Sequence, residues 1–154
     1  CLRERVRPMP GAETLLRTMT AWGAHAVLVS GGFTSFTGPV AAMLGFAEVH
    51  ANVLEIKNGR LTGALAADIV DAATKRQVLR SAADTLGLHL QSALAVGDGA
   101  NDMPMIAEAV SSGGLGVGYH PRPQLAAAAN FSVRHNDLTA LLFAQGIKPD
   151  AWIH

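Results

Sequence analysis

Residues 95–104 read Ala-Val-Gly-Asp-Gly-Ala-Asn-Asp-Met-Pro, and this stretch decides the fold that we expect for the chain. Its apolar start predicts the end of a buried strand, its glycines force a tight bend, and the residues after its proline have the pattern of a helix. Asp98, Asn101 and Asp102 are therefore expected at the carboxyl end of a strand, where open α/β sheets bind ligands. Two interpretations are open: a site for a hard cation such as Mg²⁺, or an ordinary turn whose acids cap the next helix.

Two further motifs precede this stretch in the sequence. Residues 27–34 are an apolar run, Val-Leu-Val-Ser-Gly-Gly-Phe-Thr, that includes a hydroxyl and two glycines, and Lys75 lies in the first turn of a later predicted helix. A lysine gains nothing from the helix dipole in that position, so it is either functional or a solvated surface charge. The serine and glycines likewise have a structural alternative, a helix N-cap followed by turn glycines.

Taken together, these motifs resemble those of a known family. VSGGF at residues 29–33, LTG at residues 61–63, Lys75 and VGDGAND at residues 96–102 resemble motifs two to four of the haloacid dehalogenase-like phosphatases, most closely the phosphoserine phosphatases of amino-acid biosynthesis. The resemblance implies a Mg²⁺-dependent hydrolase that converts O-phospho-L-serine to serine and phosphate through an aspartyl-phosphate, in serine biosynthesis. The family's first motif, an Asp-x-Asp strand end that carries the nucleophile, does not occur in the sequence.

The resemblance also implies a role for each motif residue. Lys75 would be catalytic as a cation that offsets the charge of the phosphate and the nucleophile. Asp98 would be catalytic as a direct Mg²⁺ ligand, and Asp102 would orient the metal shell from just behind it. The groups that would bind phosphate or substrate are the Ser30 side chain, the backbone amide of Gly31 or Gly32 at a helix start, Lys75 and Asn101.

The alternation of strands and helices predicts an α/β fold, a Rossmann-like parallel sheet with helices on both faces. In the family that the chain resembles, the first strand lies centrally, between the strands that end at Ser30 and Gly97. That strand is absent from these residues, and without it two apolar strands would have unpaired edges. The other expected elements are helices over residues 11–22, 71–86, 104–110, 121–129 and 137–145, a helix that ends near residue 44 and is kinked or restarted at Pro39, and strands over residues 25–29, 92–96, 113–118 and 131–133.

Asn58 and Gly59 predict a type I′ turn in a hairpin over residues 51–63. The hairpin is interpreted either as a flap beside the active site or as a plain edge ribbon. The glycine-rich residues 113–118 do not match a dinucleotide-binding motif, because no G-x-G-x-x-G with a later acid follows a strand.

Length and composition define the remaining expectations. The 154 residues are expected to form a single core domain fragment over residues 1–154, with residues 1–9 as the end of a cap or linker. The helix-like opening without Met is interpreted as the tail of a longer chain, or as a renumbered protein. Charge is balanced, with 12 Lys and Arg against 12 Asp and Glu, so neither nucleic acid nor an anionic membrane is favoured as a partner. One cysteine and no signal-peptide pattern favour the cytoplasm.

Two classes of function stay open. The first is a phosphatase for phosphoserine, or for another small phosphate ester, whose fold and nucleophile are completed by an upstream segment. The second is a catalytically inert fragment or binding module that holds a weak metal or anion site. Because the nucleophilic aspartate is absent, we expect these residues alone to be inactive; the sequence does not predict an oligomeric state.

Overall fold

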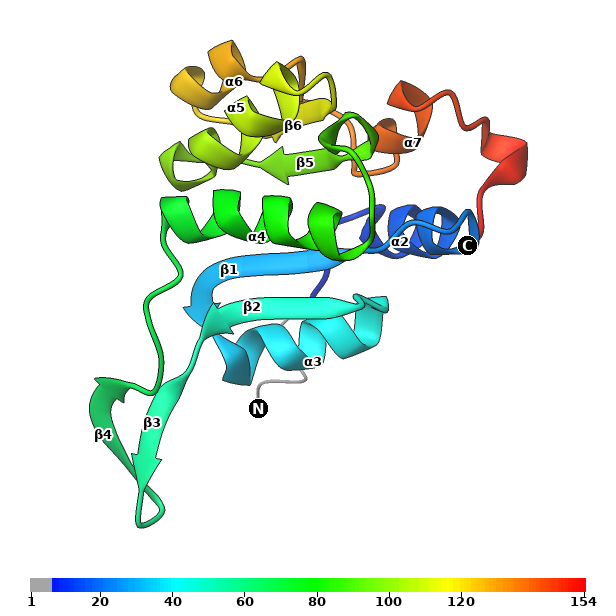
Figure 1. Ribbon diagram of the computed structural model, residues 1–154. Helices are drawn as coiled ribbons and strands as arrows, with labels where there is room; N and C mark the ends of the chain where they lie inside the picture. Colours follow the sequence, from blue (N-terminus) through cyan, green and yellow to red (C-terminus); the bar gives the residue numbers. More distant parts are fainter. Residues whose placement is uncertain (1–6) are drawn as a thin grey trace. The chain divides into compact units, whose positions relative to one another are not determined.

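The computed structural model describes residues 7–154, which form an α/β protein as expected (Figure 1). They divide into two compact units: the residues up to Ile69 together with Asn136–His154, and Val70–His135. The expected cap or linker over residues 1–9 lies largely outside the described residues. No helix of residues 7–154 is long and apolar enough to cross a membrane.

The first unit is built around two parallel strands. β1 (Val27–Phe33) pairs with β2 (Glu48–Asn52), α3 (Thr34–Leu44) packs against both strands, and α2 (Ala12–Ala21) packs against α3. Figure 1 shows the two strands side by side with α3 along them. The register between the strands shifts after Ser30, so β1 bulges at the two glycines that follow.

The structure differs from the expectations for this unit in four details. The strand expected over residues 25–29 continues to Phe33, and its residues are half-buried or exposed because only one neighbouring strand covers it in the described chain. The following helix begins at Thr34, so its N-cap is Phe33 and not Ser30. β2 was not predicted as a separate strand. Pro39 lies inside one continuous helix, so the helix does not restart there.

The C-terminal residues complete the first unit by packing on α2. They form α7 (Ala140–Ala144), shorter than the helix expected over residues 137–145, and the short helix η3 (Pro149–Ala151). The hydroxyl of Thr18, which is fully buried, accepts a hydrogen bond of 2.8 Å from the backbone N–H of Ile153. The polar group that α2 buries is therefore satisfied by the end of the chain.

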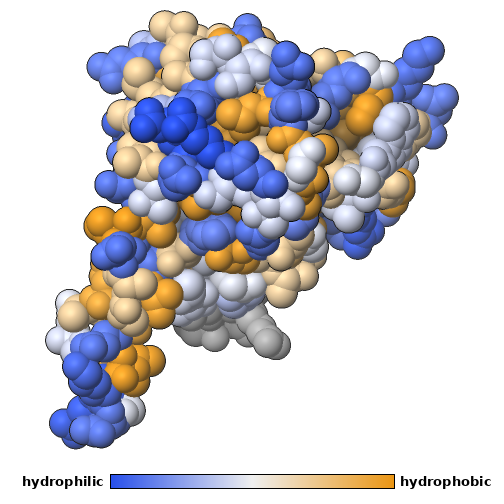
Figure 2. Space-filling model, viewed as in Figure 1, coloured by the Kyte–Doolittle hydropathy of each residue, from blue (hydrophilic) through white to orange (hydrophobic). Residues whose placement is uncertain are grey.

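The predicted hairpin is confirmed, with strands β3 (Leu54–Lys57) and β4 (Arg60–Leu65) in place of the expected range 51–63. Asn58 and Gly59 have φ values of 52° and 75°, as a type I′ turn requires. Ile56 and Leu61 face each other across the strands, and each is 64% exposed. Figure 2 accordingly shows apolar side chains among charged ones on the hairpin surface.

The second unit is a three-stranded parallel sheet with helices. Its strands are β5 (Leu94–Gly97), β6 (Leu115–Tyr119) and β7 (Phe131–Val133), in that order. Residues 90–92, of which Ser92 was assigned to a strand, instead form the short helix η1 (Leu90–Ser92). The helices are α4 (Ala72–Thr85), α5 (Met103–Ser111) and α6 (Pro123–Ala128), and the core consists of Ala95, Met105, Ile106, Ala109 and Leu125.

Close packing explains the glycines of β6. A Cβ atom at residue 116 would lie 2.6 Å from Cγ2 of Val110, so only glycine lets α5 approach the strand so closely. Gly116 thus serves helix-to-strand contact, whereas a Cβ atom at Gly118 would meet Pro121 and Ser132.

β1 and β5 share one feature that bears on function. Within the described part of the chain, β1 pairs only with β2, and β5 pairs only with β6. Each strand therefore has one edge without a strand partner among residues 7–154, as the sequence led us to expect.

Candidate active site

The turn after β5 is closed by the side chain of Asp102. The short helix η2 (Ala100–Asp102) follows the turn, and Oδ2 of Asp102 accepts hydrogen bonds from the backbone N–H groups of Asp98 and Gly99 at 3.0 and 3.3 Å. A Cβ atom on residue 97 would lie 2.3 Å from Cβ of Asp102, so the turn can close only on a glycine. The spacing from Gly97 to Asp102 is therefore a packing requirement of the turn.

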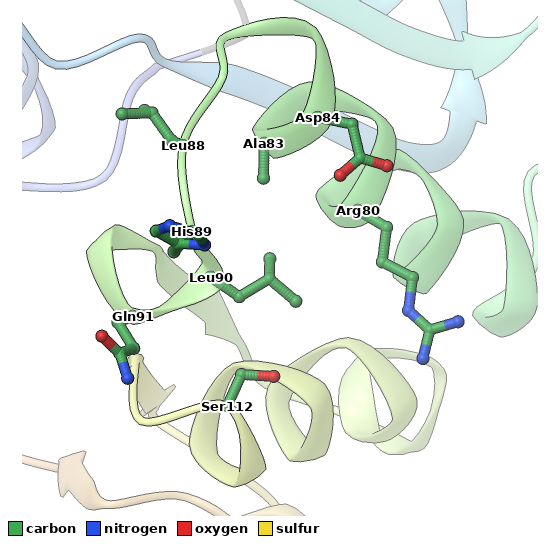
Figure 3. Close-up of a pocket in the computed structure, with 8 residues that line it drawn as sticks. All are labelled: Arg80, Ala83, Asp84, Leu88, His89, Leu90, Gln91 and Ser112. Carbon is green, nitrogen blue, oxygen red and sulfur yellow. The ribbon is translucent and has the colours of Figure 1, made fainter.

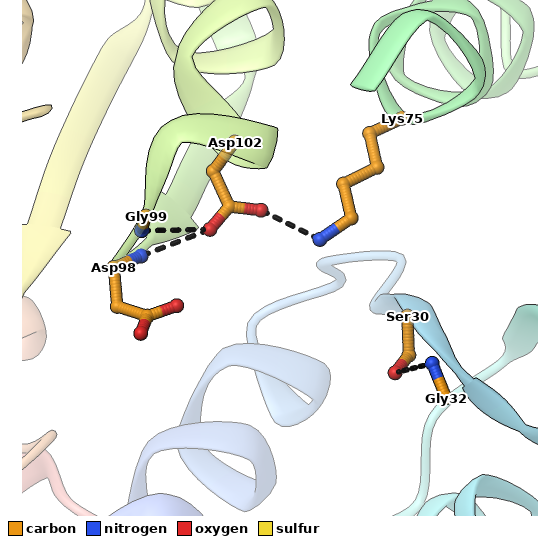
Figure 4. A network of polar contacts seen from close by, with 6 residues as sticks. All are labelled: Ser30, Gly32, Lys75, Asp98, Gly99 and Asp102. Carbon is orange, nitrogen blue, oxygen red and sulfur yellow. Dashed lines mark hydrogen bonds and ion pairs between the residues drawn. The ribbon is translucent and has the colours of Figure 1, made fainter. Parts of the chain in front are cut away.

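Lys75 is paired with the second oxygen of the same carboxylate. Its Nζ atom lies 2.7 Å from Oδ1 of Asp102, and the two side chains are only 13% and 9% exposed (Figure 4). α4 begins at Ala72, three residues before Lys75, and is capped by Asp71, whose carboxylate accepts a hydrogen bond from the N–H of Thr74. Lys75 is thus not the solvated surface charge of the alternative interpretation.

The electrostatics favour an ionised pair. Burial by itself would raise the pKa of Asp102, but the hydrogen bonds from Lys75 and from the N–H of Asp98, together with the lysine charge, hold that pKa below its usual range. The Asp102 carboxylate is therefore ionised at neutral pH, and both of its oxygens are already engaged.

Asp98 has a different environment. Its backbone N–H and carbonyl are bonded to Asp102 and to the N–H of Arg122, whereas no side chain of the described residues hydrogen-bonds or pairs with its carboxylate. Asp98 and Asn101 are both exposed. Figure 4 shows the Asp98 carboxylate apart from the Lys75–Asp102 pair.

This donor set partly fits a magnesium site. Mg²⁺ takes one or two protein carboxylates and completes its shell with water and phosphate oxygens, and Asp98 offers one free carboxylate. Among residues 7–154, no three His, Cys, Asp or Glu side chains come together to hold a metal ion. The described residues thus offer Mg²⁺ one direct protein ligand, Asp98, while Asp102 fixes the turn that carries it.

The other predicted phosphate-binding residues belong to the first unit. Oγ of Ser30 accepts a hydrogen bond of 3.0 Å from the N–H of Gly32 (Figure 4), and Nδ2 of Asn52 donates one of 2.8 Å to the carbonyl of Gly31. Asn52 is 5% exposed and was missed by the sequence analysis. Asn52 could have been found only from its position at the end of β2, beside the bulge of β1, and this position is known only once β2 is recognised as a strand.

A cavity of about 630 Å³ lies in the second unit at the C-terminal ends of α4 and α5 (Figure 3). Lys75 lies in the first turn of α4, whereas the residues of that helix that line the cavity begin at Arg80. None of the predicted site residues lines it; the lining residues are Arg80, Ala83, Asp84, Leu88, His89, Leu90, Gln91 and Ser112. The cavity is therefore separate from the candidate active site.

Acidic residues at the carboxyl end of a parallel strand, one of them paired with a buried lysine from a neighbouring helix, lie where open α/β sheets bind ligands. The chain belongs to the haloacid dehalogenase-like hydrolase family, whose sequence profile matches residues 1–107.

Individual relatives narrow the comparison. The chain is 41% identical over 146 residues to a phosphoserine phosphatase of Streptomyces coelicolor, covering 95% of this chain and 35% of that protein. It is 43% identical over 144 residues to a phosphoserine phosphatase of Albidiferax ferrireducens, covering 91% and 59%. The chain thus spans about a third to three fifths of the length of these curated relatives.

Solved structures agree with these sequence matches. A probable phosphoserine phosphatase from Vibrio cholerae matches with a TM-score of 0.86 at 34% identity, over 97% of this chain and 45% of that one. A phosphoserine phosphatase solved as a phospho-aspartyl intermediate analogue matches with a TM-score of 0.81 at 31% identity, over 94% and 66%. The expected family is confirmed, including its likeness to phosphoserine phosphatases.

Proposed function

We propose that the complete protein is a Mg²⁺-dependent phosphomonoesterase that hydrolyses O-phospho-L-serine to serine and phosphate, and that these residues are its C-terminal part. The observation that carries the proposal is the buried Lys75–Asp102 pair beside the free carboxylate of Asp98, at the carboxyl end of β5. The names of the relatives that share up to 43% identity with the chain support the choice of substrate. A place in serine biosynthesis, in the cytoplasm, is part of the proposal.

The proposed reaction has two displacements at phosphorus. An aspartate carboxylate attacks the phosphoryl group, the bond from phosphorus to the serine oxygen breaks, and water then hydrolyses the aspartyl-phosphate. The nucleophile and the acid/base aspartate would come from a segment upstream of residue 1, since the sequence contains no Asp-x-Asp. The unpartnered edges of β1 and β5 are the kind of edge at which a further strand pairs.

The described residues would bind the phosphoryl group and compensate its negative charge. Lys75, held by Asp102, would place a cation against the transferring phosphoryl group, because phosphoryl transfer depends on positioning and charge compensation. Asp98 would be the direct ligand of Mg²⁺, which supplies positive charge to the phosphate oxygens when bound. Asp102 would orient both Lys75 and the Mg²⁺ ligands. Besides Lys75, the groups that would bind phosphate or substrate are Ser30, the amide of Gly31 or Gly32, and Asn101.

The first test is the activity of the full-length protein. Phosphoserine should be hydrolysed faster than phosphothreonine or p-nitrophenyl phosphate, and activity should disappear with EDTA and return with Mg²⁺. A preference for another ester would keep the family and exclude the proposed substrate.

Replacement of Lys75 tests the catalytic assignment. Lys75→Ala should lower kcat by several orders of magnitude, because it removes the charge that faces the phosphoryl group. Lys148→Ala is the matched control, since Lys148 is exposed and its side chain has no hydrogen bond or ion pair within the described chain. A Lys75→Ala enzyme within threefold of the control would exclude a catalytic lysine at this position.

A further inference from the structure

A second ion pair joins α4 to α5, and the proposed chemistry does not use it. Nε and Nη2 of Arg80 each donate a hydrogen bond of 2.8 Å to a different carboxylate oxygen of Glu108. The Glu108 side chain is only 16% exposed, and Arg80 is 44% exposed. Figure 3 shows Arg80 reaching from α4 toward α5 at the edge of the cavity. Two parallel hydrogen bonds between a guanidinium and a carboxylate fix orientation as well as distance.

Both ion pairs join α4 to the segment formed by η2 and α5, and they do so at nearly the same separation in the sequence. Lys75 and Asp102 are 27 residues apart in the sequence, and Arg80 and Glu108 are 28 apart. Lys75 and Arg80 are therefore separated by about one and a half turns, or roughly 7.5 Å along α4. Two contacts at different heights resist both sliding and rotation of one helix against the other.

α4 buries little apolar surface. None of its residues is fully buried, and of its residues Leu79 packs against the core cluster of the second unit. A helix held by little buried surface depends more on its polar contacts for its exact position. The bidentate pair is thus the best-defined restraint on α4 after the Lys75–Asp102 pair itself.

We infer that Arg80 and Glu108 are positioning residues for Lys75, a role that rests on the proposed function. The pair holds α4 in register with α5, so that Nζ of Lys75 keeps its place beside Asp102 and the turn after β5. A displacement of about 1 Å in a catalytic group can cost on the order of 10²-fold in rate, so loss of this restraint acts on turnover. Substrate binding depends also on Ser30, the amide of Gly31 or Gly32, and Asn101, so it changes less than turnover.

The test uses full-length enzyme carrying Arg80→Gln, Arg80→Lys or the exchanged pair Arg80→Glu with Glu108→Arg. Arg17→Gln is the matched control, because it also breaks an Arg–Glu pair, an exposed one within a single helix, together with a hydrogen bond from Arg17 to the carbonyl of His154. The measurements are kcat and KM for phosphoserine, and hydrogen–deuterium exchange of the amides of residues 72–85.

Arg80→Gln should lower kcat by about 10-fold or more with KM within about twofold, and should speed exchange in the first turns of α4. The kcat of Arg80→Lys, which keeps the charge but loses the two-point contact, should lie between those of the wild type and Arg80→Gln. The exchanged pair should recover most of the loss in kcat. A kcat within twofold of the Arg17→Gln control, or an exchanged pair no better than the single variant, would overturn the inference. If the wild type hydrolyses no phosphate ester, the proposed function fails, and unchanged exchange in Arg80→Gln would separately refute the helix restraint. If Arg80→Gln does not fold, Arg80→Lys and the exchanged pair decide by the same measurements.

Discussion

Asp98 and Asp102 are four residues apart and have opposite environments. Asp102 is buried, and its two oxygens are used by Lys75 and by two backbone N–H groups. Asp98 is exposed, and its carboxylate has no partner within the described residues. One side chain is thus free to bind a ligand, while the other holds the turn and the lysine.

This difference predicts different responses to the same substitution. In the full-length enzyme, Asp98→Asn should sharply raise the Mg²⁺ concentration needed for half-maximal activity, because a neutral oxygen replaces an anionic ligand. Asp102→Asn should change Mg²⁺ affinity or activity less, by roughly 10–100-fold, since it removes a supporting group. Mg²⁺ titrations of both variants make the measurement. An unchanged Mg²⁺ requirement in Asp98→Asn, or the reverse order of severity, would show that the ligand is assigned wrongly.

Gly97 tests the packing of the turn. In Gly97→Ala the new methyl group would lie 2.3 Å from Cβ of Asp102, so the Asp102 side chain or the turn must shift. We expect a loss of about 1–3 kcal/mol in the free energy of unfolding, as for other overpacked sites, together with a fall in activity. Gly63→Ala adds a methyl group where nothing lies within 4 Å, and it controls for the glycine-to-alanine change itself, although its positive φ carries its own strain. Equal activity in wild type and Gly97→Ala would mean that Asp102 need not hold its observed position.

At the scale of elements, β1 and β2 are joined by a surface cluster at their N-terminal ends. Oε1 of Glu48 lies 2.7 Å from Nε2 of His25, and Oε2 lies 3.2 Å from Nε2 of His50. The hydrogen bonds from His25 and then His50 lower the pKa of Glu48 below its ordinary value of 4.5. The ionised carboxylate is thus the form that ties the two strands together.

The sign of the pH dependence follows from this lowered pKa. The contribution of Glu48 to stability is present above 4.5 and is lost as the pH falls through the lower pKa of the folded state. Thermal unfolding of wild type and Glu48→Gln should therefore give a higher Tm for wild type near neutral pH and converging values in acid. A difference in Tm that grows as the pH falls below 4.5 would contradict this assignment.

Elements with strong local signals could be predicted from the sequence, and those without them could not. Asn58 and Gly59 supply the positive φ values of a hairpin turn, so the hairpin was found with an error of a few residues. β2 has no run of apolar residues, since Glu48, His50 and Asn52 are polar, and it is recognisable as a strand only through its pairing with β1. Ser30 was placed at a helix start because its glycines resemble turn residues, whereas they form a bulge within β1.

For the whole molecule, the missing nucleophile motif leads to the prediction that the 154 residues alone do not hydrolyse phosphoserine with Mg²⁺. Co-expression with the upstream part of the same gene should restore activity, because that part would supply the nucleophilic aspartate. Intact-mass measurement must first verify that the sample contains these residues and nothing more. Magnesium-dependent turnover by such a verified sample would refute the proposal that the nucleophile lies upstream.

The sequence by itself determined the family, the α/β class and the motif residues, because these depend on residue types at short spacings along the chain. Tertiary structure alone decided that Lys75 is paired with Asp102 across 27 residues, that Asp98 is left free, and that Asn52 holds the carbonyl of Gly31. It also decided that Arg80 donates two hydrogen bonds to Glu108. The physical reason is that hydrogen bonds and ion pairs between elements depend on helix register and burial, and neither quantity is encoded in any local pattern of residues.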